Sequence, residues 1–188
     1  EQYIEAQFSD PITVVIDLSF PNLGGGLLGQ TQSNYVIAGW ANTRAGLQAG
    51  ADPDDTIQVW LPAGSTIPVR YNSGDGIVTA EDRVFITRAN YLTTIGSTAG
   101  VTASIQMNSS FNWDYTAESI DPGKYCFQSV VIHEVGHALG FTSAIDSRPS
   151  DMEILDIFRF QRSDGGANDY NPDTLTEFSN HPRLVAFN

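Results

Sequence analysis

The stretch VVIHEVGHALGFTSAID, residues 130–146, contains the pattern H-E-x-x-H at His133, Glu134 and His137. The longer run CFQSVVIHEVGHALGF, residues 126–141, predicts a helix, because it is strongly apolar and Gly140 is a natural stop. Residues four apart on a helix lie on one face, so both imidazoles can point at one place. Glu134 is rotated by about 100° from His133, close to that place without sharing it.

Paired histidines at this spacing are typical zinc ligands, with Zn–N distances of about 2.0–2.1 Å. Zinc acidifies a bound water, and a neighbouring carboxylate can take its proton as it attacks a carbonyl carbon. The structural alternative is a pair of histidines with ordinary partners, but burying such groups in an apolar helix is costly. The motif therefore predicts zinc-dependent peptide hydrolysis, with His133 and His137 as ligands and Glu134 as general base and acid.

The segment HEVGHALGF resembles the zincin metallopeptidases, and its H-E-x-x-H-x-x-G portion matches the metzincin consensus up to Gly140. The next consensus position, a His or Asp, is Ser143 here. The chain is similar to a family of secreted bacterial zincin-like proteases. That resemblance implies an extracellular protein that acts on a peptide or protein substrate. It is carried by VVIHEVGHALGFTSAID, EILDIFRF, PITVVIDLSF, ASIQMNSSFNWDY and NPDTLTEFSNHPRLVAFN, which span most of the chain.

The third zinc ligand is the open question, since a Ser143 hydroxyl is a poor substitute for an imidazole or carboxylate. The resemblance favours a ligand beyond Asn188, because the family has a further His-bearing segment there. The domain would then be truncated at its C-terminal end. Within the sequence, His181 is the best candidate, and SNHPR around it reads equally well as a solvated turn. Asp146 and Asp156 are downstream carboxylate alternatives.

Three other residues near the motif have structural explanations as well as metal-binding ones. Asp156 could pair with Arg159 across one helical turn, or accept a hydrogen bond from a ligand histidine and orient it. Met152 is expected in the core rather than in a metzincin Met-turn. Cys126 is expected to be a structural thiol rather than a zinc ligand.

Composition restricts the function classes. The chain has 188 residues and a net charge of −13, so binding to a nucleic-acid backbone is not expected. A single cysteine excludes an intrachain disulfide, and no apolar run is long enough to span a membrane. Excess acid fits an extracellular protein or one that binds calcium, with candidate calcium loops at residues 52–55, 71–82 and 163–173, although the 71–82 loop begins with Tyr71 where calcium loops have Asp. The protein is expected to be a monomer.

The sequence predicts a single α/β (α+β) domain over residues 1–188, zincin-like, with a twisted mixed sheet. VTASIQMN, residues 101–108, is expected to be the edge strand that binds an extended substrate, as the resemblance implies. The rival interpretation is a binding or structural module of the same fold whose zinc site is incomplete. Expected elements are strands at 11–20, 55–64 and 101–115, a backing helix at 31–50, a helix at 79–96, the active-site helix at 126–140 and a short apolar element at 152–160.

Overall fold

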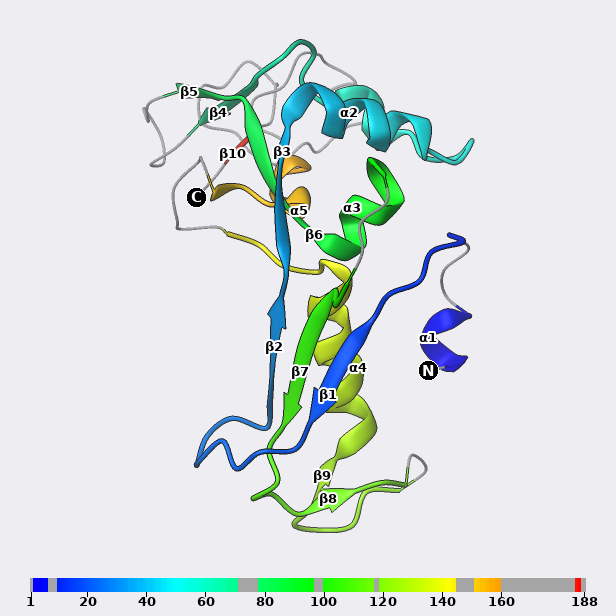
Figure 1. Ribbon diagram of the computed structural model, residues 1–188, viewed down its shortest axis with the longest axis vertical. Coiled ribbons are helices and arrows are strands. Elements are labelled where there is room, and N and C mark those ends of the chain that lie inside the picture. Colours follow the sequence, from blue (N-terminus) through cyan, green and yellow to red (C-terminus); the bar gives the residue numbers. More distant parts are fainter. Residues whose placement is uncertain are drawn as a thin grey trace. The chain divides into compact units, whose positions relative to one another are not determined.

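The computed structural model describes residues 2–6, 10–70, 78–96, 100–116, 119–144, 151–159 and 185–186. These residues form helices and several small sheets, which confirms the predicted α+β class (Figure 1). They group into two compact units whose stretches alternate along the chain. Unit 1 comprises Glu1–Tyr35, Thr87–Leu92 and Ser97–Phe141, and unit 2 comprises Val36–Ile86, Thr93–Gly96 and Thr142–Asn188. The single domain over residues 1–188 stays a prediction.

Unit 1 is built on a three-stranded sheet. β1 (Ile16–Ser19) runs parallel to β7 (Ala103–Met107), and β2 (Gly29–Ser33) runs antiparallel to β7 on its other side. β7 is therefore the central strand, and alternate residues along it are fully buried. The prediction that residues 101–108 form the edge strand is wrong, because β7 is paired on both sides and the edges of this sheet are β1 and β2.

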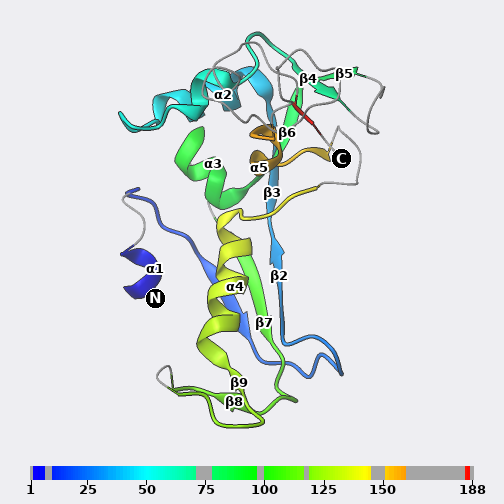
Figure 2. The same cartoon turned by 180° about the vertical axis from the view of Figure 1, so that it is seen from behind.

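The predicted active-site helix is present as α4 (Phe127–Leu139). It packs against β2 and β7 and covers one face of the sheet, as the reverse view shows (Figure 2). Ala138 of the helix joins Ile105 and Met107 of β7 in the core of this unit. Gly140 ends the helix in the left-handed conformation, with φ of 100°, as the sequence predicted.

Asn108 fixes the glycine-rich loop between β1 and β2. Its buried side chain donates from Nδ2 to the carbonyl oxygens of Gly24 and Leu27, both at 2.7 Å. Its Oδ1 accepts a hydrogen bond from the Leu23 amide at 3.1 Å. Because the loop leads directly into Gly29, Asn108 helps to set where β2 begins beside α4.

Unit 1 also contains a two-stranded sheet and a short N-terminal helix. β8 (Trp113–Asp114) pairs in parallel with β9 (Tyr125–Cys126), which leads directly into α4. α1 (Gln2–Glu5) is a single turn near the N-terminus. The strand predicted at residues 101–115 is thus split into β7 and β8, and the one predicted at 11–20 is reduced to β1.

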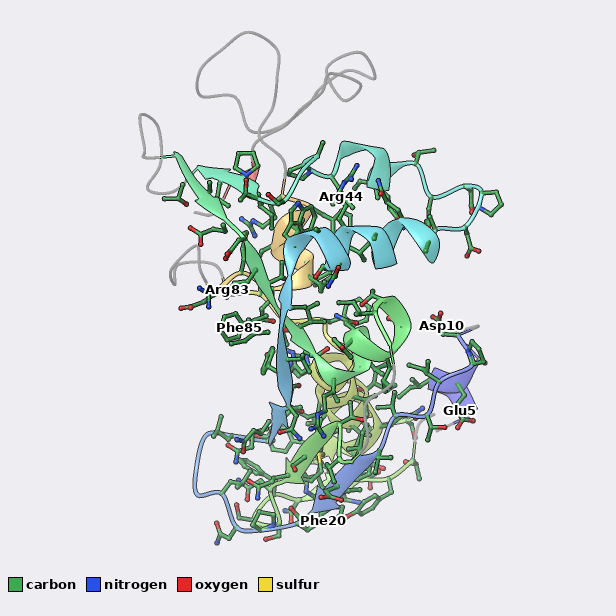
Figure 3. The ribbon with its side chains drawn as sticks, turned by 45° about the horizontal axis from the view of Figure 1, so that its top comes forward. Glu5, Asp10, Phe20, Arg44, Arg83 and Phe85 are labelled. Atoms are coloured by element: carbon green, nitrogen blue, oxygen red, sulfur yellow. The ribbon has the colours of Figure 1, made fainter. Side chains whose placement is uncertain are left out.

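Unit 2 contains most of the other strands and three short helical elements. Val84 and Ile86 of β6 (Arg83–Thr87) are fully buried, whereas the side chains of Arg83 and Phe85 project from the opposite side of this strand (Figure 3). The Trp40 indole is also fully buried and donates to the Pro62 carbonyl at 3.2 Å. The elements are β3 (Tyr35–Gly39) paired with β6 (Arg83–Thr87), the sheet of β10 (Val185–Ala186), β4 (Ile67–Arg70) and β5 (Val78–Glu81), with α2 (Trp40–Ala49), η1 (Ile57–Trp60) and α5 (Ile154–Ile157).

Three sequence predictions of secondary structure are corrected. The backing helix expected at 31–50 is instead β2, β3 and α2, so its first residues form a strand of the sheet rather than a helix behind it. The helix expected at 79–96 is β5, β6 and α3 (Arg88–Thr94), because its β-branched centre favours a strand. The strand expected at 55–64 is the short 3₁₀ helix η1.

Candidate metal centre

The histidines of the motif converge in the way that their helical spacing predicts. His133 and His137 lie one turn apart on α4, and their Nε2 atoms are 3.1 Å apart. The rings meet edge to face, with centroids 4.6 Å apart. His133 is exposed and His137 is half-buried, so the converging nitrogens are accessible from solvent.

The end of α4 fixes the tautomer of His137. Its Nδ1 lies 3.0 Å from the Phe141 carbonyl oxygen, which can only accept a hydrogen bond. Nδ1 therefore carries the proton in the neutral ring, and Nε2 keeps its lone pair for a ligand. Ligand histidines are commonly oriented in this way by a partner on the other ring nitrogen.

Gly140 makes that contact possible by reversing the chain after the helix. Its amide donates to the His137 carbonyl at 3.1 Å, and the next amide, of Phe141, donates to the Gly136 carbonyl at 3.0 Å. This pair of bonds is the Schellman motif, which requires a left-handed residue at Gly140. The turn brings the Phe141 carbonyl back beside the His137 ring.

The distance between the two Nε2 atoms is the one expected for two ligands of a single zinc ion. Ligand nitrogens about 2.05 Å from one tetrahedral zinc ion lie about 3.3 Å from each other, close to the spacing of the two Nε2 atoms. Within the described residues, no group of three or more His, Cys, Asp or Glu side chains is placed to hold a metal ion. The third-ligand candidates His181 and Asp146 lie outside the described residues.

Asp156 is the third candidate ligand within the sequence, and its carboxylate accepts structural hydrogen bonds in unit 2. It is fully buried and accepts from the backbone amides of Ala144 and Glu153, both at 3.0 Å. The Ser143 hydroxyl donates to its other oxygen. Glu153 and Asp156 form a capping box at the start of α5, so these contacts explain Asp156 without a metal. Ser143, at the metzincin ligand position, anchors the chain after α4 to α5.

The side chain of Glu134 is buried between α4 and β2, with only 5% of the residue's surface exposed. The Thr31 hydroxyl lies 2.7 Å from its Oε2 and 2.9 Å from its carbonyl oxygen. At Gly29, an added β-carbon would lie 3.1 Å from both Cγ and Oε1 of Glu134. The sequence did not predict either contact, because residues 31–50 read as a helix and no strand is expected at Gly29. The available signal was the alternation of small residues at 29, 31 and 33 with glutamines at 30 and 32.

Cys126 and Met152 behave as ordinary structural residues. Cys126 is the N-cap residue of α4, seven residues before His133, which is about 10 Å along the helix axis and too far to share a ligand sphere. Hydrogen bonds from the side chain and backbone of Ser129 lower the pKa of the Cys126 thiol. Met152 is fully buried, and its carbonyl accepts a hydrogen bond from the Phe85 amide at 2.8 Å.

The calcium predictions are not resolved by the described residues. Residues 71–77 and 163–173 lie outside them. In the loop at 52–55, the Asp55 carboxylate accepts from the Asp52 amide at 3.1 Å, and the Asp55 amide donates to the Asp52 carbonyl at 2.9 Å. These bonds close a local turn, and calcium binding there stays a prediction.

None of the helices in the described ranges is both long enough and apolar enough to cross a membrane. Comparisons with protein-family models, curated proteins and solved structures find no match for this chain. Function must therefore be inferred from the geometry of α4 and β2.

Proposed function

We propose that this protein is a secreted zinc-dependent endopeptidase with a zincin-like fold. The observation that carries the proposal is the convergence of the His133 and His137 Nε2 atoms, with His137 held in the ligand tautomer by the Phe141 carbonyl. Glu134 follows His133 directly in the same helix, which is the place of the general base in the H-E-x-x-H pattern.

The roles of the residues follow from their chemistry. When bound, zinc acidifies a water molecule and polarises the scissile carbonyl. His133 and His137 would hold the ion. The Glu134 carboxylate takes a proton from the attacking water and returns it to the leaving nitrogen of the substrate. Its burial and its contact with Thr31 hold it in one position while it does so.

The substrate proposed is an extended peptide bound along β2. Among the described strands, β2 pairs only with β7, so its outer backbone edge is the side on which a further strand can be added. Side chains on the sheet face away from α4 are polar here, with Gln30 and Gln32 beside Gln106 of β7. Backbone pairing of this kind recognises peptide bonds with little dependence on side chains.

Replacing Glu134 by Gln tests the proposal. The Glu134→Gln variant should lose about 100- to 10,000-fold in kcat/KM for casein or a casein-derived peptide, because it lacks the general base. Its zinc content should equal that of the wild type. Glu5→Gln removes the same charge from an exposed residue and should leave activity unchanged. Unchanged cleavage by Glu134→Gln would refute the assigned role.

Zinc binding is tested separately from activity. His133→Ala and His137→Ala should each abolish zinc retention after dialysis, measured by elemental analysis. We expect weak retention in the wild type unless His181 is the third ligand. Stoichiometric zinc in both the wild type and His181→Ala would exclude that histidine. A wild type that neither retains zinc nor cleaves casein would instead support a binding module of the same fold.

A further inference from the structure

We propose that Thr31 of the edge strand is the positioning residue that holds the Glu134 carboxylate in its working orientation. The inference rests on the proposed function of Glu134 and adds a residue from a distant part of the chain. Three inward-facing positions of β2, at Gly29, Thr31 and Ser33, meet α4 at its functional residues.

The Thr31 contact is the strongest of the three. Its hydroxyl oxygen is 2.7 Å from Glu134 Oε2 and 2.9 Å from the Glu134 carbonyl oxygen. One hydroxyl proton can reach both acceptors, and the shorter contact is the one to the carboxylate. Hydrogen bonds to carboxylate oxygens are stronger than those between neutral groups. The bond therefore ties the end of the side chain to the backbone of its own residue.

Gly29 provides the space that the carboxylate needs on the same strand. A β-carbon at this position would lie 3.1 Å from Glu134 Cγ, 3.1 Å from Oε1 and 3.2 Å from Val130 Cγ1. These distances are shorter than ordinary van der Waals contact, so Glu134 already fills the space beside the glycine. One side of the carboxylate thus faces the Thr31 hydroxyl, and the other side is confined by the strand backbone.

Ser33 of β2 makes a similar contact with the next turn of α4. Its hydroxyl donates to the His137 carbonyl at 3.0 Å. The alternation of Gly29, Thr31 and Ser33 on one face follows from the register of β2, in which Thr31 lies opposite Ile105 of β7. A shift of one residue would replace these small groups by glutamines. The register of the sheet therefore places the hydroxyls at Glu134 and His137.

Fixing Glu134 should affect turnover more than substrate binding. A glutamate side chain has several rotamers, and holding one of them in advance removes an entropic cost from the chemical step. The Thr31 side chain points toward α4, so its removal leaves the backbone of β2 unchanged for peptide pairing. The expected signature is a reduced kcat with an unchanged KM.

The test compares Thr31→Val with Thr31→Ser. Valine keeps the shape and removes the hydroxyl, and should lower kcat by about 10- to 100-fold with KM and zinc content unchanged. Serine keeps the hydroxyl and should restore most of the activity. Thr43→Val is the matched control, because it makes the same substitution in α2, where the Thr43 hydroxyl donates to the Gly39 carbonyl at 3.1 Å and has no role in the proposed site. Equal activities for Thr31→Val and Thr31→Ser would overturn the proposal, and Thr31→Ala replaces valine if that variant does not fold.

A second measurement separates this proposal from the proposed function. Urea midpoints of metal-free wild type, Thr31→Val, Glu134→Met and the double variant form a cycle that reports the contact without activity. Non-additive midpoints support the contact, and additive midpoints contradict it. If Glu134→Gln remains active, the peptidase mechanism fails and the positioning role fails with it. If Glu134→Gln is inactive but Thr31→Val keeps full kcat, only the positioning role is overturned.

Discussion

Gly140 links the shape of the helix end to the chemistry of His137. Its φ of 100° suits glycine, and an added β-carbon would lie 2.7 Å from Asn90 Cγ and 2.8 Å from Thr87 Oγ1. A side chain here must therefore disturb either the left-handed turn or the groups around it. Either change moves the Phe141 carbonyl away from His137 Nδ1.

We therefore predict two effects of Gly140→Ala. The free energy of unfolding should fall by about 2–4 kcal/mol, from backbone strain and the close contacts together. Zinc affinity should fall about 10- to 100-fold, because the partner that orients His137 is displaced. Urea unfolding and competition with a zinc chelator measure the two effects. Gly136→Ala, in the same helix with no atom near its β-carbon position, should change neither by a comparable amount.

The residues of the motif could be predicted from sequence, but their partners could not. His133, Glu134 and His137 are related by helical spacing alone, which is a local property of the chain. Thr31 is 103 residues away from Glu134, and only the pairing of β2 with β7 brings it there. No local pattern contains that information. The contact between His137 and Phe141 is also local, but of this turn the sequence predicted only the helix end at Gly140.

At the level of elements, tertiary pairing overrode local propensity at β2. Residues 31–50 contain apolar residues at helical spacing, but those from 40 onward alone form the helix α2. Residues 29–33 alternate between half-buried and exposed positions, which is the pattern of a strand with one covered face. The same comparison explains the mistaken edge strand. Sequence identified residues 103–107 as a strand, but strand order depends on partners elsewhere in the chain.

Asn108 is the residue through which the β1–β2 loop should control stability. Besides its bonds to the loop, its Oδ1 accepts from the Ser110 amide at 3.0 Å and the Ser110 hydroxyl at 2.7 Å. Asn108→Ala removes a fully buried side chain that makes five hydrogen bonds to the loop and to Ser110, and should lower the free energy of unfolding by about 2–4 kcal/mol. Urea denaturation measures this loss. Asn22→Ala removes one exposed hydrogen bond from the same loop and should cost less than about 1 kcal/mol, so equal losses would contradict a special role for Asn108.

At the scale of the whole molecule, the amino-acid composition predicted a folded chain, but the sequence did not predict how that chain divides into units. The balance of apolar and charged residues indicates a folded chain, and the mixed α+β class is confirmed. The division into two compact units had no counterpart in the sequence, because each unit is assembled from three separated stretches. A linker or a change in composition marks domains that follow one another. Units whose stretches alternate carry no such boundary.

Asp114 makes the stability of the chain depend on pH in a predictable direction. It is buried, and the Asp121 amide, the Thr116 hydroxyl and the Thr116 amide donate to its carboxylate. These bonds lower the pKa of Asp114 from 3.8 to about 2, with the bond from Asp121 contributing most. The folded state thus binds this proton less readily than the unfolded state does. The resulting stabilisation is complete above pH 3.8 and is lost as the pH falls toward 2.

Asp114→Asn should remove this pH dependence. An amide cannot reproduce a charged acceptor on both oxygens, so the urea midpoint of the variant should lie below that of the wild type at pH 6. The difference should shrink as the pH falls through the interval between 3.8 and about 2, because the wild-type carboxyl then also becomes neutral. Asp17→Asn, at an exposed position in β1, is the control for the general loss of one negative charge from a chain of net charge −13. A constant difference between wild type and Asp114→Asn from pH 6 to 2 would show that the hydrogen bonds do not depend on ionisation, and would contradict the lowered pKa.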